Sequence, residues 1–213
     1  MPGHLPNTAG TVLIVIDLQN DFCPGGALAI EEGDKIVPLV NRLIQGHEHV
    51  VLTQDWHPAG HSSFATSHAG AAPFSSIEMP YGPQTLWPDH CIQGTHGGAF
   101  HSALDWTKTE LVVRKGFRKN IDSYSAFNEN DRRTPTGLAG YLRERGLERL
   151  VLVGLATDFC VAFSALDAVR LGFETTVLTD ACRAINLNGS LAQAEAQMRG
   201  AGIKLMHSSA LAP

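Results

Sequence analysis

Cys160 lies in the segment GLATDFCVAFSALDAV, residues 154 to 169, where a run of apolar residues gives way to a helical pattern. A thiol in the first turn of a helix faces free backbone N–H groups and the positive end of the helix dipole, which stabilise a thiolate and lower its pKa. The same N–H groups could bind the oxyanion that forms when a thiolate attacks a carbonyl. Because free cysteines are also among the most buried residues, core packing remains the competing interpretation.

Polar residues follow three other apolar runs. Asp17 follows TVLIVI, Asp55 follows HVVLTQ and Lys115 follows ELVVR. One aspartate after a strand is commonly a helix cap or turn residue. Ligands of open α/β sheets bind at the carboxyl ends of strands, so four such ends carrying Asp, Asp, Lys and Cys favour a site. There a lysine would lower the thiol pKa further, and a carboxylate could take the thiol proton.

A second cluster lies in DWHPAGH and WPDHC and contains Asp55, His57, His61 and His90. In Asp-x-His on an extended chain both side chains point to the same face and could hold one ion. Imidazole and carboxylate without thiolate suit zinc, iron or manganese. Solvated surface histidines are the alternative interpretation.

The elements that must position these residues alternate along the chain. Apolar runs without polar alternation are typical of strands buried on both faces of a parallel sheet. Helical patterns lie between them, over residues 34–45, 136–146, 158–171 and 189–201. This alternation predicts an α/β fold, with a three-layer α/β/α doubly wound and mostly parallel sheet. Its six strands are expected at 11–17, 49–55, 110–116, 149–154, 174–180 and 203–206.

The length of 213 residues and the hydrophobic share of 44% predict one domain spanning residues 1–213. The segment of about residues 56–109 shows no period and is rich in His, Gly, Pro and aromatic residues. Its tryptophans and phenylalanines do not fit disorder, so we expect this loop to fold over something.

Charge and cysteine use exclude several classes of function. With 16 Lys and Arg against 21 Asp and Glu, and no basic cluster, nucleic acid is not an expected partner. No stretch approaches the roughly 20 apolar residues of a membrane span, and the N-terminus shows no secretory leader. The four cysteines form no CxxC pair, which fits free thiols in the cytoplasm. A homo-oligomer is left open.

The motifs VIDLQNDFCPGGAL, TQDWHPAGHSSF, LWPDHCIQGTHGGAF, VVRKG and VGLATDFCV occur in this order. Together they closely resemble the bacterial nicotinamidase/pyrazinamidase family of the isochorismatase-like hydrolase fold, over nearly the whole chain. The resemblance implies hydrolysis of nicotinamide to nicotinate and ammonia, with pyrazinamide as a further substrate. Recycling of nicotinamide from NAD breakdown is the implied metabolic role.

Residue by residue, the resemblance implies a catalytic triad. Cys160 matches the nucleophile that forms a thioester, Asp17 the base and Lys115 the cation that holds the ion pair. A cis peptide bond between Leu155 and Ala156 is implied as well, and it would turn the N–H of Ala156 towards the oxyanion.

The resemblance also implies one divalent metal ion, expected as zinc with iron or manganese as alternatives, that binds the pyridine nitrogen. Asp55, His57 and His90 match its ligand positions, and His61 is a candidate further ligand. Three aromatic residues match the walls of the substrate pocket: Phe22 and Trp87, which would sandwich the ring, and Tyr124.

Two alternatives remain at this stage. Other hydrolases of the fold act on ureido or carbamoyl substrates, so the fold alone does not choose the substrate. A catalytically inactive metal-binding relative is the second alternative, and the intact set of Asp17, Lys115 and Cys160 argues against it.

Overall fold

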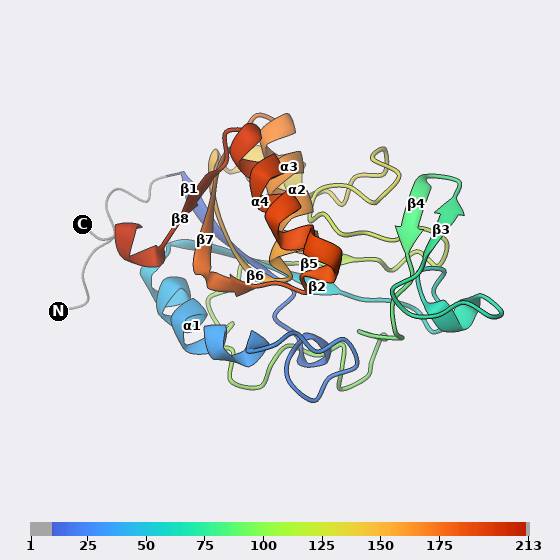
Figure 1. Cartoon of the computed structure of the whole chain (residues 1–213). Coiled ribbons are helices and arrows are strands. Elements are labelled where there is room, and N and C mark those ends of the chain that lie inside the picture. The colour runs from blue at the N-terminus through green and yellow to red at the C-terminus, as the bar shows by residue number, and fades with distance from the viewer. Residues whose placement is uncertain (1–9, 212–213) are drawn as a thin grey trace.

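The computed structural model describes residues 10–211. Six strands form one sheet in the order β5-β2-β1-β6-β7-β8, and every neighbouring pair is parallel. The predicted six-stranded, mostly parallel sheet is therefore confirmed (Figure 1). The strands are β1 Thr11–Ile16, β2 His49–Asp55, β5 Leu111–Lys115, β6 Arg149–Leu155, β7 Glu174–Arg183 and β8 Lys204–Met206.

Strand β1 shows why the strands have continuous apolar sequences. Val12, Ile14 and Ile16 pack into the hydrophobic core on one face of the sheet, whereas Leu13 and Val15 pack into the core on the other face. Successive side chains of a strand point to opposite faces, so a strand covered on both sides needs an apolar residue at every position.

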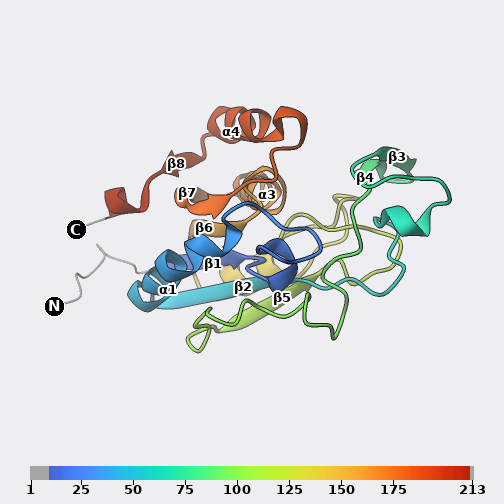
Figure 2. The ribbon, with the colours of Figure 1, turned by 60° about the horizontal axis from the view of Figure 1, so that its bottom comes forward.

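Helices cover both faces and complete three layers (Figures 1 and 2). Residues Val40, Leu43 and Ile44 of the first helix pack with Leu13, and the other helices pack against the opposite face. Pro38 lies in the first turn of its helix, where proline costs no backbone hydrogen bond. The helices are α1 Val37–Gly46, α2 Leu138–Glu144, α3 Ala162–Arg170 and α4 Ser190–Gly200.

The order of the strands leaves a crevice at their carboxyl ends. After β1 the chain adds β2 and β5 on one side, and it later returns to place β6 on the other side of β1. The connections that follow β1 and β6 therefore diverge, and this reversal is where doubly wound sheets bind ligands. Asp17, Asp55 and Lys115 lie at these strand ends, as predicted.

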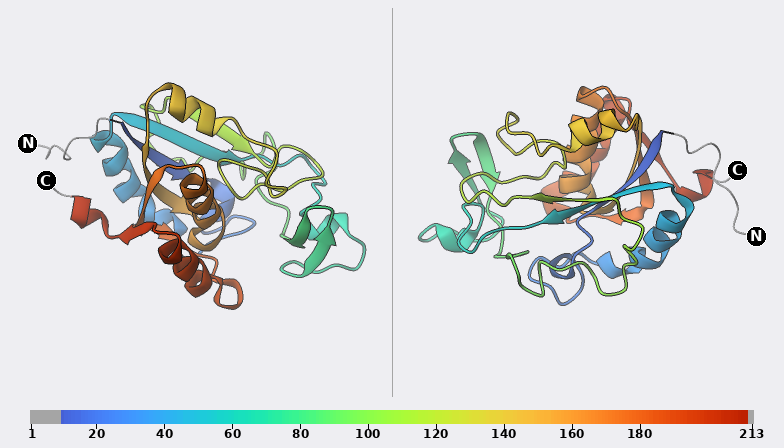
Figure 3. Two further views of the ribbon diagram at one scale, coloured as in Figure 1. Left: turned by 90° about the horizontal axis from the view of Figure 1, so that it is seen from above. Right: turned by 180° about the vertical axis from the view of Figure 1, so that it is seen from behind.

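The long segment 56–109 is ordered and contains an antiparallel hairpin that the sequence pattern did not reveal. Its strands are β3 Ser76–Met79 and β4 Gly82–Thr85, and they stand apart from the main sheet (Figure 3). Each strand has four residues and one of them contains Pro83, so the alternation is too short to recognise. Elsewhere the segment is held by backbone hydrogen bonds, for example from Trp87 N to Ser63 O at 2.8 Å.

No helix among residues 10–211 is long and apolar enough to cross a bilayer. All four cysteines are free, as their spacing predicted, and all four are buried. The expectation about a leader concerns the N-terminus, of which residues 1–9 lie outside the described residues.

Gly154 has a φ of +118°, and a Cβ atom there would lie 2.1 Å from the carbonyl oxygen of Ile16 on the neighbouring strand. We expect Gly154→Ala to lower the free energy of unfolding by about 3 kcal/mol or more, because overpacking and a disfavoured φ add. Urea denaturation monitored by circular dichroism measures this change. The control Gly140→Ala, on an open face of α2, should be neutral or stabilising by about 0.5–1 kcal/mol. Equal stability of the two variants would contradict the packing between β1 and β6.

Candidate functional site

Lys115 has 1% of its surface exposed, and its ammonium group lies at the centre of a buried cluster. Its Nζ atom is 2.8 Å from Asp17 Oδ2 and 2.9 Å from Asp55 Oδ1. The same nitrogen is 3.5 Å from Cys160 Sγ and donates to the carbonyl of Ser123 at 3.0 Å. The ends of β1, β2, β5 and β6 thus converge on one cation.

Thr53 holds Asp17 in place from the neighbouring strand. The Thr53 hydroxyl donates to Asp17 Oδ1 at 2.6 Å, and the backbone N–H of Asp17 donates to the same hydroxyl oxygen at 3.1 Å. The other oxygen, Oδ2, accepts no hydrogen bond of regular geometry among the described residues, although it faces the Lys115 ammonium. That oxygen is available to accept a proton.

Burial and charge set the protonation of this cluster. Burial raises the pKa of Asp17, and the attraction of Lys115 offsets only part of that effect. Burial would lower the pKa of Lys115, but Asp17 and Asp55 together raise it well above its usual value. Lys115 therefore remains a cation, while Asp17 is a carboxylate with an increased affinity for a proton.

Cys160 lies in a π-helical turn, Thr157–Val161, that leads from β6 into α3. Burial raises its pKa well above the usual value, and the opposing effect of Lys115 is too small to reverse this. The lowered thiol pKa expected from the sequence is therefore wrong, because the helix-start argument omits the cost of burying a negative charge near Asp17 and Asp55. The thiol rests protonated and needs a base, which Asp17 can supply.

Cys160 lines a small cavity. The predicted aromatic residues Phe22, Trp87 and Tyr124 line it, together with Ala156. The Leu155–Ala156 peptide bond is cis, as expected. His90, predicted as a metal ligand, also lines this cavity. Sequence reasoning missed four further lining residues, which are Leu28, Asp122, Phe159 and Ile185.

Asp55, His57 and His90 form a group that could hold a metal ion, with one candidate ligand atom from each within 4.8 Å of the others. Asp55 Oδ2 is 3.0 Å from His57 Nε2 and 3.3 Å from His90 Nε2. The Nδ1–H of His57 donates to the Gly116 carbonyl at 2.9 Å, and that of His90 to the Pro88 carbonyl at 2.8 Å. These bonds orient each ring so that its Nε2 atom faces Asp55, as in metal sites with oriented histidines.

Two neighbours keep this group in place. Gln19 donates from its side-chain amide to the Asp55 carbonyl at 2.8 Å and accepts from the Asp55 N–H at 2.8 Å. Gly116 leaves room for the His57 ring, because a Cβ there would lie 2.4 Å from His57 Cε1. Although burial opposes its charge, the pKa of Asp55 is lowered well below its usual value by His57 and Lys115.

His61 lies beside this group, with its ring centre 4.4 Å from that of His57. A second close group joins His57, His61 and Asp122. Both ring nitrogens of His61 have partners, however: Nδ1 accepts from the Ser63 hydroxyl at 2.7 Å, and Nε2 donates to the Arg118 carbonyl at 2.9 Å. In this geometry His61 supports the His57 ring and has no lone pair directed at Asp55.

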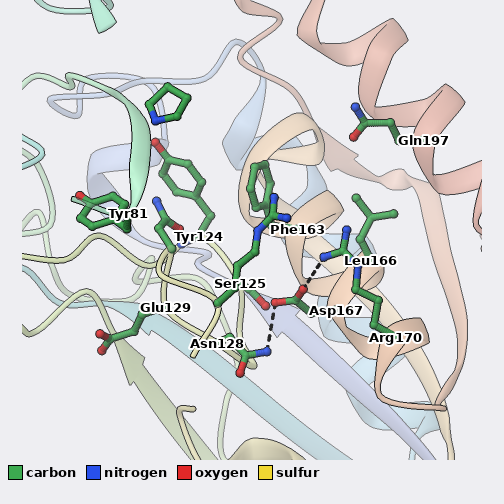
Figure 4. Close-up of a pocket in the computed structure, with 13 residues that line it drawn as sticks. Tyr81, Tyr124, Ser125, Asn128, Glu129, Phe163, Leu166, Asp167, Arg170 and Gln197 are labelled. Carbon is green, nitrogen blue, oxygen red and sulfur yellow. Dashed lines mark hydrogen bonds and ion pairs between the residues drawn. The ribbon is translucent and has the colours of Figure 1, made fainter. Parts of the chain in front are cut away.

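A larger cavity of about 310 Å³ is also lined by Tyr124 (Figure 4). Tyr81 and Tyr124 line one side, and Phe163 and Leu166 of α3 line the other. It contains neither Cys160 nor any residue of the metal group. The smaller cavity therefore holds the chemistry.

Comparison with known proteins agrees with this geometry. The family model described as "Isochorismatase domain" matches residues 11–210. The chain is 53% identical to the nicotinamidase of Acinetobacter baylyi, over 92% of each protein, and 46% identical to that of Escherichia coli, over 91% of this chain and 92% of that one. This chain belongs to the isochorismatase family.

Solved structures support the same assignment. The Acinetobacter baumanii nicotinamidase/pyrazinamidase is 53% identical, with a TM-score of 0.95 over 96% of this chain and 99% of that one. The Pyrococcus horikoshii pyrazinamidase, solved in complex with zinc, is 35% identical, with a TM-score of 0.75 over 93% of this chain and 99% of that one. The isochorismatase-like fold expected from the motifs is confirmed.

Three of the missed cavity residues lie next to predicted site residues or motifs in the sequence of this isochorismatase-family chain, and that proximity could have identified them. Phe159 is adjacent to Cys160, Leu28 ends the motif CPGGAL, and Asp122 lies two residues before Tyr124. Ile185 had no such signal, because it lies in a loop far along the chain and reaches the cavity only through folding.

Iodoacetamide should alkylate Cys160 before the other three thiols, because only Cys160 among them lines the cavity. The rate should rise with pH through the neutral range, since a thiol with a raised pKa gains thiolate as pH increases. Lys115→Met should slow alkylation at least about tenfold at a given pH, because losing the cation raises the Cys160 pKa further. Peptide mass spectrometry over time measures both effects. Equal labelling of Cys23 or Cys182 would contradict the proposed access.

Proposed function

We propose that this protein is an amidohydrolase that converts nicotinamide to nicotinate and ammonia. The observation that carries the proposal is the presence of Cys160 and His90 in the walls of one aromatic cavity. A substrate that fits both must carry a carboxamide at one end and a metal-binding ring atom at the other. The nicotinamidase relatives at 53% and 46% identity support the same substrate.

In the first half-reaction, Asp17 takes the proton from the Cys160 thiol as the sulfur attacks the carboxamide carbon. The carbonyl oxygen becomes an oxyanion, which we assign to the backbone N–H groups of Ala156 and Cys160. When the C–N bond breaks, Asp17 returns the proton to the leaving nitrogen, and ammonia departs. The nicotinoyl group is left as a thioester on Cys160.

In the second half-reaction, Asp17 takes a proton from water as the water oxygen attacks the thioester carbon. The C–S bond then breaks, the proton returns to sulfur and nicotinate is released. The raised pKa of Asp17 suits both halves, because the base must hold the proton until the leaving group needs it. Lys115 keeps Asp17 and Cys160 together and balances the negative charge between them.

Asp55, His57 and His90 are the residues that would hold a divalent metal ion. The Nδ1 atoms of both histidines are already hydrogen-bonded to backbone carbonyls, so each Nε2 atom can serve as a ligand. A set of one carboxylate and two imidazoles suits zinc, and also iron or manganese. Such an ion supplies a Lewis acid for the lone pair of the ring nitrogen. The zinc complex of the Pyrococcus horikoshii relative supports zinc. We assign His61 to positioning His57 and not to the ligand set.

Phe22 and Trp87 would contact the faces of the substrate ring, and Tyr124 would close one side. The Tyr124 hydroxyl accepts from Trp87 Nε1 at 3.1 Å, which fixes both rings relative to each other. Aromatic walls suit a flat heteroaromatic ring through offset stacking. Pyrazinamide keeps a ring nitrogen and the carboxamide, so we expect it to be a second substrate.

We also propose that residues 1–213 form one domain, in which the segment of about 56–109 supplies the metal and substrate contacts. The four free thiols support a cytoplasmic location, where the nucleophile stays reduced.

Purified protein should release ammonia from nicotinamide. Cys160→Ser and Asp17→Asn should each lower kcat by about 10³-fold or more, because the nucleophile and its base act as one unit. A coupled ammonia assay measures the rates, and nicotinate binding by calorimetry shows whether the cavity remains intact. The matched control Cys23→Ser changes a buried thiol outside the cavity and should keep wild-type activity. Wild-type protein with reduced thiols and bound metal that releases no ammonia would refute the proposed function.

Asp55→Ala should remove most of the bound metal, since Asp55 contacts both imidazoles. His61→Ala should retain it, because the ring nitrogens of His61 are directed elsewhere. Elemental analysis of each purified variant gives the metal content directly, and a chelator should strip wild-type metal and abolish turnover. Metal loss in His61→Ala at the level of Asp55→Ala would show that His61 belongs to the ligand set.

A further inference from the structure

Ile185 belongs to the loop of residues 184–189, which connects β7 to α4 (Figure 1). This half-buried side chain lines the cavity that contains Cys160. Leu28 and Phe159 line the same cavity. Neither the triad nor the metal group uses this loop.

Asp158 holds the 184–189 loop in place. Its carboxylate accepts from the backbone N–H of Ile185 at 3.0 Å and of Asn186 at 2.7 Å, and also from the Ser190 hydroxyl. The Asp158 side chain is buried and forms no ion pair within residues 10–211. A buried carboxylate needs such donors, so the loop satisfies Asp158 and Asp158 fixes the loop.

Asp158 shares its π-helical turn with Cys160. The nucleophile and the anchor of the loop are therefore two residues apart in one helical turn. Any shift of this turn moves Cys160 and Ile185 together, which keeps the distance between the thiol and the Ile185 wall constant.

A second contact joins this region to the opposite segment. Arg183, at the end of β7, lies with Nε 3.6 Å from Glu32 Oε2. Glu32 follows Leu28 and Ile30, which belong to the segment that also supplies Phe22. This partly exposed ion pair joins the two segments that supply Leu28 and Ile185 to the cavity.

We propose that Ile185 determines which rings the substrate cavity accepts, and that Asp158 is the residue that positions it. The cavity is small, and Cys160 has only 7% of its surface exposed. A wall fixed by a buried carboxylate cannot yield to a larger ring without breaking hydrogen bonds. The site therefore takes carboxamides of a single six-membered heteroaromatic ring and rejects substituted or fused rings. This inference rests on the proposed function.

Ile185→Ala should shift the preference between larger rings and nicotinamide. The probes are nicotinamide, its 4-, 5- and 6-methyl derivatives and quinoline-3-carboxamide, each compared by kcat/KM. We expect the kcat/KM of at least one larger probe, divided by that of nicotinamide, to rise about tenfold or more. One or two methylene groups in an apolar pocket change substrate discrimination by about this factor. Leu187→Ala, in the same loop but outside the cavity, is the matched control and should leave all ratios unchanged.

Asp158→Asn should loosen the loop without removing volume from the cavity. We expect KM for nicotinamide to rise at least about fivefold, with a smaller change in kcat, because Cys160, Asp17 and Lys115 remain in place. The control Asp180→Asn removes a partly buried carboxylate that also accepts from a backbone N–H and a hydroxyl, both of Ser208, and that lies outside the cavity. That control should leave KM unchanged.

A double-mutant cycle separates positioning from a general structural effect. If Asp158 acts through Ile185, then Asp158→Asn should change the substrate ratio in the wild-type background but not in the Ile185→Ala background. Hydrogen exchange of amides 184–190 should accelerate in Asp158→Asn and not in Asp180→Asn, a readout that is independent of turnover.

Unchanged ratios in Ile185→Ala would overturn the assignment of specificity, even when wild-type turnover of nicotinamide is normal. Unchanged exchange in Asp158→Asn would overturn the positioning role, whatever the substrate. Absence of wild-type turnover refutes the proposed function instead, so the two failures are distinguishable.

Discussion

The buried Lys115 ammonium is the contact on which the site depends. A charge without water must be paired, and Lys115 is paired twice, with Asp17 at 2.8 Å and Asp55 at 2.9 Å. Removing Lys115 would leave two buried carboxylates without the cation that they share. The three residues come from the ends of β1, β2 and β5, so the ion pairs also align the carboxyl ends of three neighbouring strands. Cys160 reaches the same cation from β6.

Asp55 connects the two halves of the chemistry. One of its oxygens faces Lys115, and the other lies within 3.0 Å of His57 and 3.3 Å of His90. A positive charge beside His57 and His90 therefore acts on the same carboxylate that balances the charge of Lys115. The electrostatic environment of the thiol and the group that would hold the ring nitrogen are coupled through one side chain.

Much of the fold was predictable because the strands are buried on both faces and the patterns are long. The six apolar runs became the six strands, and the four helical patterns became α1 to α4. The hairpin of β3 and β4 was missed because four residues, one of them proline, carry no detectable alternation. The expected low pKa of Cys160 was wrong, since a helix start predicts local stabilisation of charge but says nothing about burial among carboxylates.

The sequence by itself determined which residues could do chemistry and in which order the strands and helices follow. Those properties are local, because they depend on residue type, spacing and the period of apolar residues. Only the tertiary structure decided that Lys115 lies between two carboxylates, that both ring nitrogens of His61 have other partners, and that Ile185 reaches the cavity. These facts depend on distances between residues far apart in the chain, and packing sets such distances where local pattern cannot.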